Sequence, residues 1–143
     1  MSEIVIDHSC KPIIFAKFTG PPEDQGILKY LDASDVDIAR GEPYVLILEA
    51  MKLDTLSTTQ RKLFASWIET NRLEIQRLCA GQAYVVPSVL QRMVIRSIFM
   101  LQPMPVAYKV FSTPKEAWEW CLERLEENNV TFEERIRTCP ISA

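Results

Sequence analysis

The sequence predicts an α/β fold, a mixed sheet of four to five strands with helices packed on it. Short apolar runs alternate with segments of helical period from residue 13 to residue 127. Each helical segment starts within a few residues of the end of an apolar run, which is the pattern of right-handed βαβ crossovers. No linker or low-complexity stretch interrupts this alternation, so we expect one domain over residues 1–129 and a tail over residues 130–143.

The predicted centre of the sheet is the run Tyr-Val-Leu-Ile-Leu at residues 44–48, which contains no charged residue. A strand covered by helices on both faces has this composition, because neither face meets water. Four other runs have strand character: residues 4–8, 13–18, 83–86 and 105–111. The first two lie on either side of Lys11-Pro12, and they predict an N-terminal hairpin beside parallel central strands.

Three predicted helices begin with a capping signal, in which a Ser or Thr side chain accepts a hydrogen bond from a first-turn amide. These helices are expected at residues 57–78, 88–101 and 113–127. Gln60 and Gln91 follow their caps by three residues, as in a capping box. Gly81 is expected to end the first helix in a left-handed conformation. Pro21-Pro22 opens another helix, short or irregular, and the polar residues 32–41 lead from it into the central strand.

Composition and charge exclude several classes of function. The chain has 143 residues and a net charge of −3, which argues against nonspecific nucleic-acid binding, since that needs a basic field. The cysteines are scattered without a CxxC pair, so no zinc or other metal site and no cofactor is predicted. They are Cys10, Cys79, Cys121 and Cys139. With no signal-peptide pattern, free thiols indicate a reducing cytoplasm. The longest apolar stretch, residues 89–101, is too short and too charged to be a transmembrane segment.

The order of elements resembles the STAS fold over residues 4–128: a hairpin, then alternating helices and strands, with a Ser/Thr-rich turn before the second helix. The segment Val110-Phe-Ser-Thr-Pro-Lys-Glu-Ala-Trp-Glu-Trp120 is similar to the end of bacterial STAS-like proteins, where a capped helix packs its Ala-Trp on the sheet. The resemblance implies a STAS-like α/β domain, the fold of the anti-sigma-factor antagonists. STAS-like relatives share broad architecture with CRAL-TRIO lipid-transfer domains.

In the antagonists, a loop of type Asp-Ser-Ser/Thr-Gly starts the second helix, and a partner kinase phosphorylates its first Ser. Ser57, Thr58 and Thr59 lie at the corresponding place here, and Thr58 matches the acceptor. The Asp and the Gly of the family loop are absent from this sequence. The resemblance therefore implies a phospho-switch at Thr58, beside the alternative that these residues only cap the helix.

The helix expected at residues 88–101 has more apolar surface than a helix on one sheet face needs. The excess predicts contact with neighbouring helices, with a second copy of the chain, or with a ligand such as an acyl chain. Met93, Phe99 and Met100 are the candidate interface residues, since the sequence does not show which of them face outward. Arg92 and Arg96 would lie on the polar rim of such an interface, or contact an acidic partner.

Other residues with chemical potential have ordinary structural explanations. Trp67 and Trp118 lie on apolar helical stripes and are predicted to be core, and Cys121 is predicted to be a buried small hydrophobe. His8 follows Asp7, but adjacent strand residues point to opposite faces, so a surface histidine is expected.

The sequence leaves two main classes of function open. The first is a non-enzymatic regulatory or scaffold module that binds a partner protein, with a homodimer as one form of it. The second is a small-molecule or lipid carrier, with an apolar ligand between the helix at residues 88–101 and the sheet. An enzyme is not predicted, because Glu49 has no identifiable nucleophile or metal partner and no phosphate-binding glycine loop is present.

Overall fold

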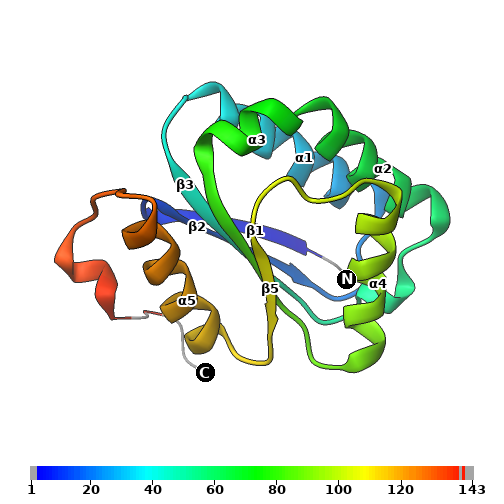
Figure 1. The fold of residues 1–143 in the computed structure, drawn as a ribbon. Helices are drawn as coiled ribbons and strands as arrows, with labels where there is room; N and C mark the ends of the chain where they lie inside the picture. The colour runs from blue at the N-terminus through cyan, green and yellow to red at the C-terminus, as the bar shows by residue number, and fades with distance from the viewer. Residues whose placement is uncertain (1–2, 139, 141–143) are drawn as a thin grey trace.

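The computed structural model describes residues 3–138 and residue 140, and it contains a five-stranded sheet with helices on both faces (Figure 1). The spatial order of the strands follows the chain: β1 (Glu3–Cys10), β2 (Ile13–Thr19), β3 (Tyr44–Ala50), β4 (Cys79–Val85) and β5 (Tyr108–Phe111). β1 and β2 are antiparallel, and the pairs from β2 to β5 are parallel. The predicted hairpin and the mixed α/β sheet are therefore confirmed.

The central strand β3 is buried on both faces, as its composition predicts. Val45 and Ile47 point to one side of the sheet, and Leu46 and Leu48 point to the other, because side chains alternate along a strand. The sheet therefore separates two hydrophobic clusters, and each must be covered by helices.

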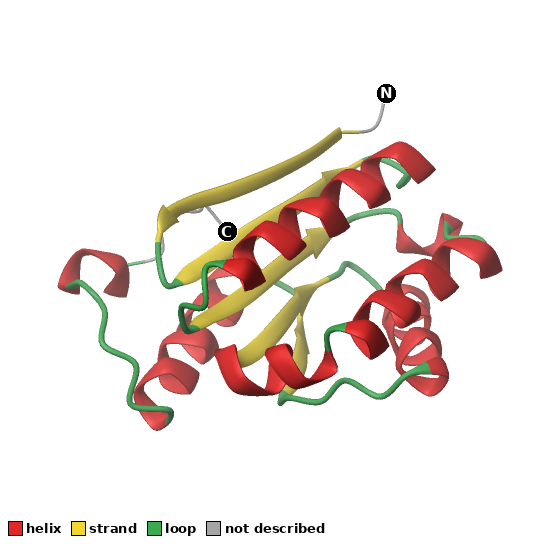
Figure 2. Cartoon of the chain, turned by 90° about the horizontal axis from the view of Figure 1, so that it is seen from above, coloured by secondary structure: helices red, strands yellow, loops and turns green. Residues whose placement is uncertain are grey.

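Four helices cover one face of the sheet, and one helix covers the other (Figures 1 and 2). The first face carries α1 (Asp24–Ala39), α2 (Thr58–Thr70), α3 (Arg72–Leu78) and α4 (Val89–Leu101), with a 3-10 turn, η1 (Leu53–Thr55), between β3 and α2. The second face carries α5 (Pro114–Glu127). All three predicted N-caps are present: Ser57, Ser88 and Thr113 each accept a hydrogen bond from the backbone amide three residues later.

The first helix is longer than the sequence prediction. The polar residues 32–39, expected to lead into a strand, form the second half of the sixteen-residue helix α1. Ile27, Leu31 and Ile38 are buried at helical spacing, so a narrow apolar stripe is enough to hold the helix on the sheet. The sequence analysis expected a short or irregular helix because most positions between these buried residues are polar. That prediction was wrong.

The helix expected at residues 57–78 is divided into α2 and α3 at Asn71. The backbone of Asn71 leaves the helical region, and its Nδ2 atom donates to the Trp67 carbonyl oxygen at 3.0 Å. The prediction that Gly81 ends this helix was also wrong, since Gly81 lies inside β4. A Cβ atom there would lie 3.0 Å from Cη2 of Trp120, so the close approach of α5 disfavours a larger residue at this position.

Residues 130–137 of the tail pack on the same face as α5. A 3-10 turn, η2 (Glu134–Arg137), places Ile136 in that core, and the indole Nε1 atom of Trp118 donates to the Ile136 carbonyl oxygen at 2.7 Å. Trp118 and Cys121 are buried, as predicted. The fourth cysteine, Cys139, lies outside the described residues.

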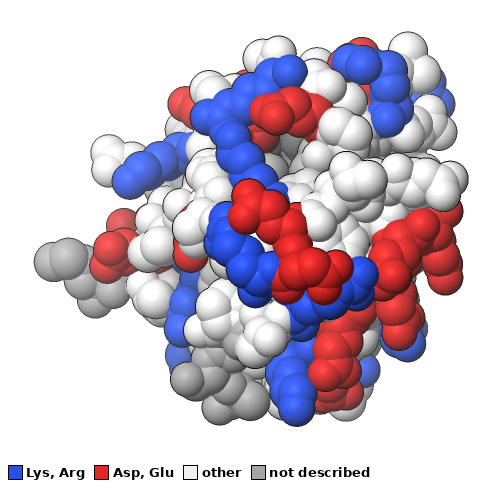
Figure 3. All heavy atoms as spheres, turned by 90° about the vertical axis from the view of Figure 1, so that its left-hand side faces the viewer, with Lys and Arg blue, Asp and Glu red and all other residues white. Residues whose placement is uncertain are grey.

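Charge and hydropathy give two further findings about the described residues. On the side of the molecule that Figure 3 shows, acidic and basic side chains are interspersed. Such a surface lacks the single-sign field that nonspecific nucleic-acid binding needs. No helix in the described part of the chain is long and apolar enough to cross a membrane.

Candidate functional site

A cavity of about 80 Å³ lies between the sheet and the helices α1, α2 and α4. Leu46 and Leu48 of β3 form its floor, and Ile95 and Ile98 of α4 lie on its wall with Trp67 of α2. The 3-10 turn η1 and the segment after it contribute Leu53 and Leu56. The cavity is therefore in the place where the sequence analysis expected an apolar ligand, between the helix α4 and the sheet.

Aromatic rings frame this cavity. The rings of Tyr30 and Phe64 have centroids 6.2 Å apart, and the rings of Tyr84 and Phe99 have centroids 5.8 Å apart. Phe99 also contacts Tyr108 at 4.6 Å in an edge-to-face geometry. Tilted and edge-to-face arrangements are the ones that aromatic rings prefer, so these pairs form a rigid part of the cavity wall.

One part of the cavity wall is polar. Gln82 of β4 is only 5% exposed, and its amide oxygen accepts a hydrogen bond from the Tyr84 hydroxyl. The Gln82 amide nitrogen donates to Sγ of Cys79 at 3.9 Å, and this thiol donates to the Gly81 carbonyl oxygen at 3.3 Å. Tyr44 also lines the cavity. A buried amide at the wall of an apolar cavity is a specific place for a polar group of a ligand.

The ionisable groups of this polar part are uncharged at neutral pH. Burial raises the pKa of Tyr30, of Tyr44 and of Tyr84 above the ordinary tyrosine range. Burial also raises the pKa of the Cys79 thiol to about 11. The cause is desolvation, which disfavours the charged form of a phenol or a thiol. The hydroxyls and the thiol therefore remain neutral hydrogen-bond donors.

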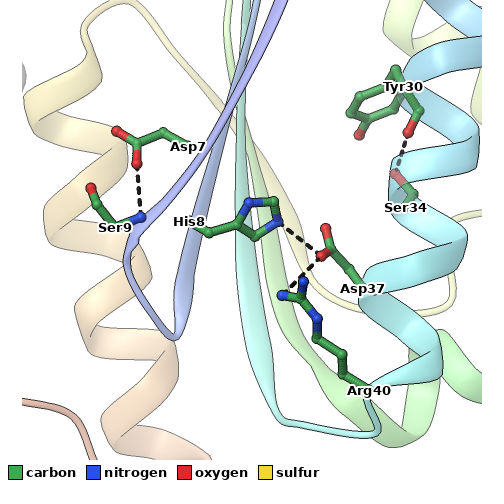
Figure 4. Close-up of polar contacts among 7 residues, drawn as sticks. All are labelled: Asp7, His8, Ser9, Tyr30, Ser34, Asp37 and Arg40. Carbon is green, nitrogen blue, oxygen red and sulfur yellow. Dashed lines mark hydrogen bonds and ion pairs between the residues drawn. The ribbon is translucent and has the colours of Figure 1, made fainter.

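Of the described residues on the cavity wall, only Asp37 is charged, and Figure 4 shows its contacts with His8 and Arg40. Its Oδ1 atom lies 2.8 Å from Nε2 of His8 and 3.6 Å from Nη1 of Arg40. The contact ties β1 to α1 across 29 residues of sequence. Oδ1 of Asp37 therefore has a hydrogen-bond partner in His8 and a nearby positive charge in Arg40.

The predicted surface histidine is therefore only half-exposed, and its partner is Asp37. Asp7 points elsewhere: it accepts a hydrogen bond from the Ser9 amide at 2.8 Å, and the hydrogen bonds to Ser9 lower the pKa of Asp7. The expectation that Asp7 and His8 do not pair was correct, because they lie on opposite faces of β1. The contact with Asp37 could not be read from the sequence, since it depends on the packing of α1.

The three residues of the predicted phospho-switch lie together at the start of α2. Ser57 Oγ accepts from the Gln60 amide at 3.1 Å, and Gln60 Oε1 accepts from the Ser57 amide at 2.9 Å, so the capping box is complete. Thr58 and Thr59 are exposed. Phosphorylation at Thr58 stays a prediction, and the exposed hydroxyl is accessible to a partner enzyme.

The candidate interface residues of α4 do not share one face. Met93 and Met100 are 58% and 80% exposed, whereas Phe99 packs inward on Tyr84 and Tyr108. Arg92 is half-buried and donates to Ser112 Oγ at 3.3 Å, and Arg96 is exposed. The outward surface of α4 carries, beside the exposed Arg96, five exposed apolar side chains, which we call the α4 outer patch: Val89, Leu90, Met93, Met100 and Leu101.

The sequence analysis named Gln91 only as part of a capping box and missed its structural role. Gln91 is buried and holds α4 to the segment after β3. Its Oε1 atom accepts from the Leu53 amide at 3.1 Å, and its Nε2 atom donates to the Met51 carbonyl oxygen at 2.6 Å. The side chain therefore does not complete the capping box predicted at Ser88, although the Ser88 hydroxyl does cap the helix. A glutamine inside an apolar arc was the available signal.

Two other predicted positions have ordinary partners. Glu49 lies 3.8 Å from Nζ of Lys17 on the neighbouring strand. Trp67, predicted to be core, is only partly buried, and its Nε1 atom donates to Asp35 at 2.8 Å. Within the described residues, no group of three or more His, Cys, Asp or Glu side chains is arranged to hold a metal ion.

A solved structure has the same architecture as this chain. It is an uncharacterized protein of the DUF3478 family from Shewanella loihica PV-4, and it is described as having a SpoIIAA-like fold. The alignment covers 85% of this chain and 95% of that protein, with a TM-score of 0.60 and 18% sequence identity. This chain has a SpoIIAA-like fold.

The STAS-like fold expected from the order of elements and from the segment at residues 110–120 is thus confirmed. At this sequence identity the likeness concerns the SpoIIAA-like fold alone. Neither a family model nor a curated protein matches the sequence.

Proposed function

We propose that this SpoIIAA-like chain binds a small apolar molecule in the cavity between α4 and the sheet, without catalysing a reaction. The cavity itself carries the proposal, because its wall is mainly aliphatic and aromatic and has a small polar part at Gln82 and Tyr44. Ligand sites in proteins usually have this composition, with a few polar groups that orient the ligand. Asp37 is the one charged residue among the described residues of the wall, and it is already paired with His8.

The size of the cavity limits the ligand. A cavity needs roughly 10–15 Å³ to hold one water molecule, so about 80 Å³ accommodates more than a water. It is smaller than the roughly 300–1,000 Å³ of sites for drug-sized molecules. We therefore expect a single ring or a short aliphatic chain, and a longer acyl chain would require α4 to move away from the sheet.

Titration with toluene, followed by NMR of isotope-labelled protein, tests this function. Toluene should shift the amide signals of residues around the cavity, and Ile98→Phe should abolish the shifts by filling the space. The matched control is Met93→Phe, which adds a ring on the outer side of the same helix, where Met93 is exposed. Absence of shifts in the unmodified protein, or shifts that persist in Ile98→Phe, would contradict ligand binding in this cavity.

The α4 outer patch favours a second candidate, a regulatory or scaffold module that binds a partner protein. Contiguous apolar side chains at the surface of a soluble domain usually mark an interface. A second copy of the chain is the simplest partner, since a two-fold dimer buries the same patch on both subunits. Arg96, which is exposed, would lie at the hydrated rim of that interface.

Light scattering at micromolar concentration tests the second candidate. A dimer mass that becomes a monomer mass in Met100→Glu would support it, because a buried charge at the interface opposes association. Leu73→Glu is the control, since Leu73 is also exposed, at 69% against 80% for Met100, but lies on α3. A monomer for the unmodified protein, with its mass unchanged in Met100→Glu, argues against self-association.

In the phospho-switch hypothesis, Thr58→Asp should alter partner binding while Thr58→Ala should not.

A further inference from the structure

The charges and hydrogen-bonding groups around the cavity limit the chemical class of ligand that it can bind. This inference rests on the function proposed above. Among the residues that the structure describes, nineteen line the cavity, and no lysine or arginine is among them. A ligand with a carboxylate or a phosphate would therefore bury a negative charge without a cation beside it, which costs several kcal/mol even after the protein relaxes.

A positively charged ligand is also disfavoured. Asp37 is the one anion among these nineteen residues, and its Oδ1 atom already contacts His8 at 2.8 Å and Arg40 at 3.6 Å. A ligand ammonium at this carboxylate would lie near the guanidinium of Arg40, whose positive charge repels a second cation. Both signs of ionic headgroup therefore lack a free counter-charge in this cavity.

The polar part of the wall offers neutral hydrogen-bond donors instead. Gln82 Nε2 carries two hydrogens, and its bond to Cys79 Sγ uses one of them. Tyr44 lies at the start of β3, and Gln82 pairs with Leu46 of the same strand, so both side chains are on the cavity face of the sheet. The Tyr44 hydroxyl is protonated at neutral pH, as in any tyrosine, and burial raises its pKa further.

We infer that the ligand is an uncharged molecule with an apolar body and a hydroxyl or carbonyl oxygen, which accepts a hydrogen bond from Gln82 or Tyr44. The apolar body lies against Leu46, Leu48 and Ile98. The polar wall of the cavity thus selects for neutral small alcohols, ketones and phenols over acids and amines of the same size. Selection arises because only the neutral head leaves no unpaired charge in the core.

A series of three six-carbon probes tests the inference at neutral pH: hexanol, hexanoate and hexylammonium. Hexanol should bind at least about tenfold more tightly than either ion, a difference of about 1.4 kcal/mol. The side-chain amide signals of Gln82 should shift with hexanol, and those of Gln76, an exposed residue of α3, should not. Hexanoate or hexylammonium binding as tightly as hexanol would overturn the inference.

A double variant identifies the groups that recognise the oxygen. Gln82→Met with Tyr84→Phe removes both partners of one buried hydrogen bond, so neither is left unpaired and the fold should persist. Hexanol affinity should fall about three- to tenfold, and toluene affinity should stay unchanged, because one ligand hydrogen bond is lost. An unchanged hexanol affinity would overturn the assignment of Gln82.

Failure of the inference is distinguishable from failure of the proposed function. If toluene binds and the three probes do not differ, the cavity binds ligands without selecting neutral heads. If neither toluene nor any probe shifts the signals of the cavity residues, the proposed function itself is wrong and the inference falls with it.

Discussion

At the scale of single residues, two buried glutamines have different roles. Gln82 faces the cavity and keeps part of its hydrogen-bonding capacity free, whereas both ends of Gln91 are used by the backbone at Met51 and Leu53. Buried amides are retained where their hydrogen bonds are made, since an unpaired one is costly. Gln91 is therefore a structural residue that fixes α4 over the cavity, and Gln82 is a candidate binding residue.

Replacing Gln91 by methionine should destabilise the protein. The change keeps the size of the side chain but leaves the Leu53 amide and the Met51 carbonyl oxygen without their partner, at a cost of roughly 1–3 kcal/mol. Urea denaturation measures the loss. The same substitution at Gln76, which is exposed on α3, should change the free energy of unfolding by less than about 0.5 kcal/mol. Equal effects at the two positions would contradict this role of Gln91.

Gly81 and Gly26 should respond oppositely to alanine. A Cβ atom at Gly81 would lie 3.0 Å from the Trp120 ring and 3.2 Å from Cγ of Arg124, so we expect a destabilisation of roughly 1–3 kcal/mol from overpacking. At Gly26, in the first turn of α1, no atom lies within 4 Å, and alanine should stabilise by up to about 1 kcal/mol. Thermal unfolding of the two variants measures both signs. A stabilised Gly81→Ala would show that α5 moves freely away from the sheet.

At the scale of elements, the start of α2 combines a local cap with a contact to α1. Besides completing the capping box, Gln60 donates from Nε2 to Asp24 at 2.8 Å. The first turn of α2 contains no acidic residue, so its positive dipole end has no negative charge on its own helix. This end of the helix could therefore accept the charge of a phosphate at Thr58.

Substitutions at Ser57 and Thr58 should separate capping from charge. Ser57→Ala should cost about 1 kcal/mol, because the Gln60 amide loses its acceptor. Thr58→Asp should stabilise by roughly 0.3–1 kcal/mol at low salt, because it places a negative charge near the free amides. Denaturation at low and high ionic strength checks the assignment, since salt should reduce the effect of Thr58→Asp and leave that of Ser57→Ala. A salt-independent gain in Thr58→Asp would exclude the dipole as its cause.

At the scale of the whole molecule, two cores share one sheet, and the helix-rich side contains the cavity. The side covered by α5 is closed by Trp118 and Ile136, both almost completely buried. Several buried phenols and thiols lie in these cores and affect stability at alkaline pH.

The free energy of unfolding should decrease as the pH rises above about 9. The pKa of the Cys79 thiol is raised from 9.0 to about 11, so between these values the unfolded chain loses a proton that the folded chain keeps. Stability therefore falls by up to about 1.4 kcal/mol per pH unit for this group. The buried tyrosines, whose pKa values are also raised, extend the loss to higher pH. Urea denaturation across this pH range measures the slope.

A cysteine control makes the alkaline prediction specific. Cys79→Ala should reduce the slope between pH 9.0 and about 11, because it removes the thiol that titrates. Cys10→Ala is the matched variant, since it removes a thiol that is only partly buried at the end of β1. An unaltered slope in Cys79→Ala would show that other groups account for the alkaline loss of stability.

The sequence alone determined the order of strands and helices, the N-terminal hairpin, the double burial of β3 and the caps at Ser57, Ser88 and Thr113. These features depend on local properties: apolar period, proline and glycine placement, and hydrogen bonds between residues three positions apart. The SpoIIAA-like fold follows from their order, so it was predictable before any contact was known.

Only the tertiary structure decided the features of the candidate site. The pairing of His8 with Asp37, the inward position of Phe99, the two roles of Gln82 and Gln91, and the cavity itself each join residues from different elements. The length of α1 and the preference for glycine at position 81 depend on packing in the same way. Local sequence patterns indicate which surface of an element is apolar. The way one element packs on another decides which residues each side chain contacts.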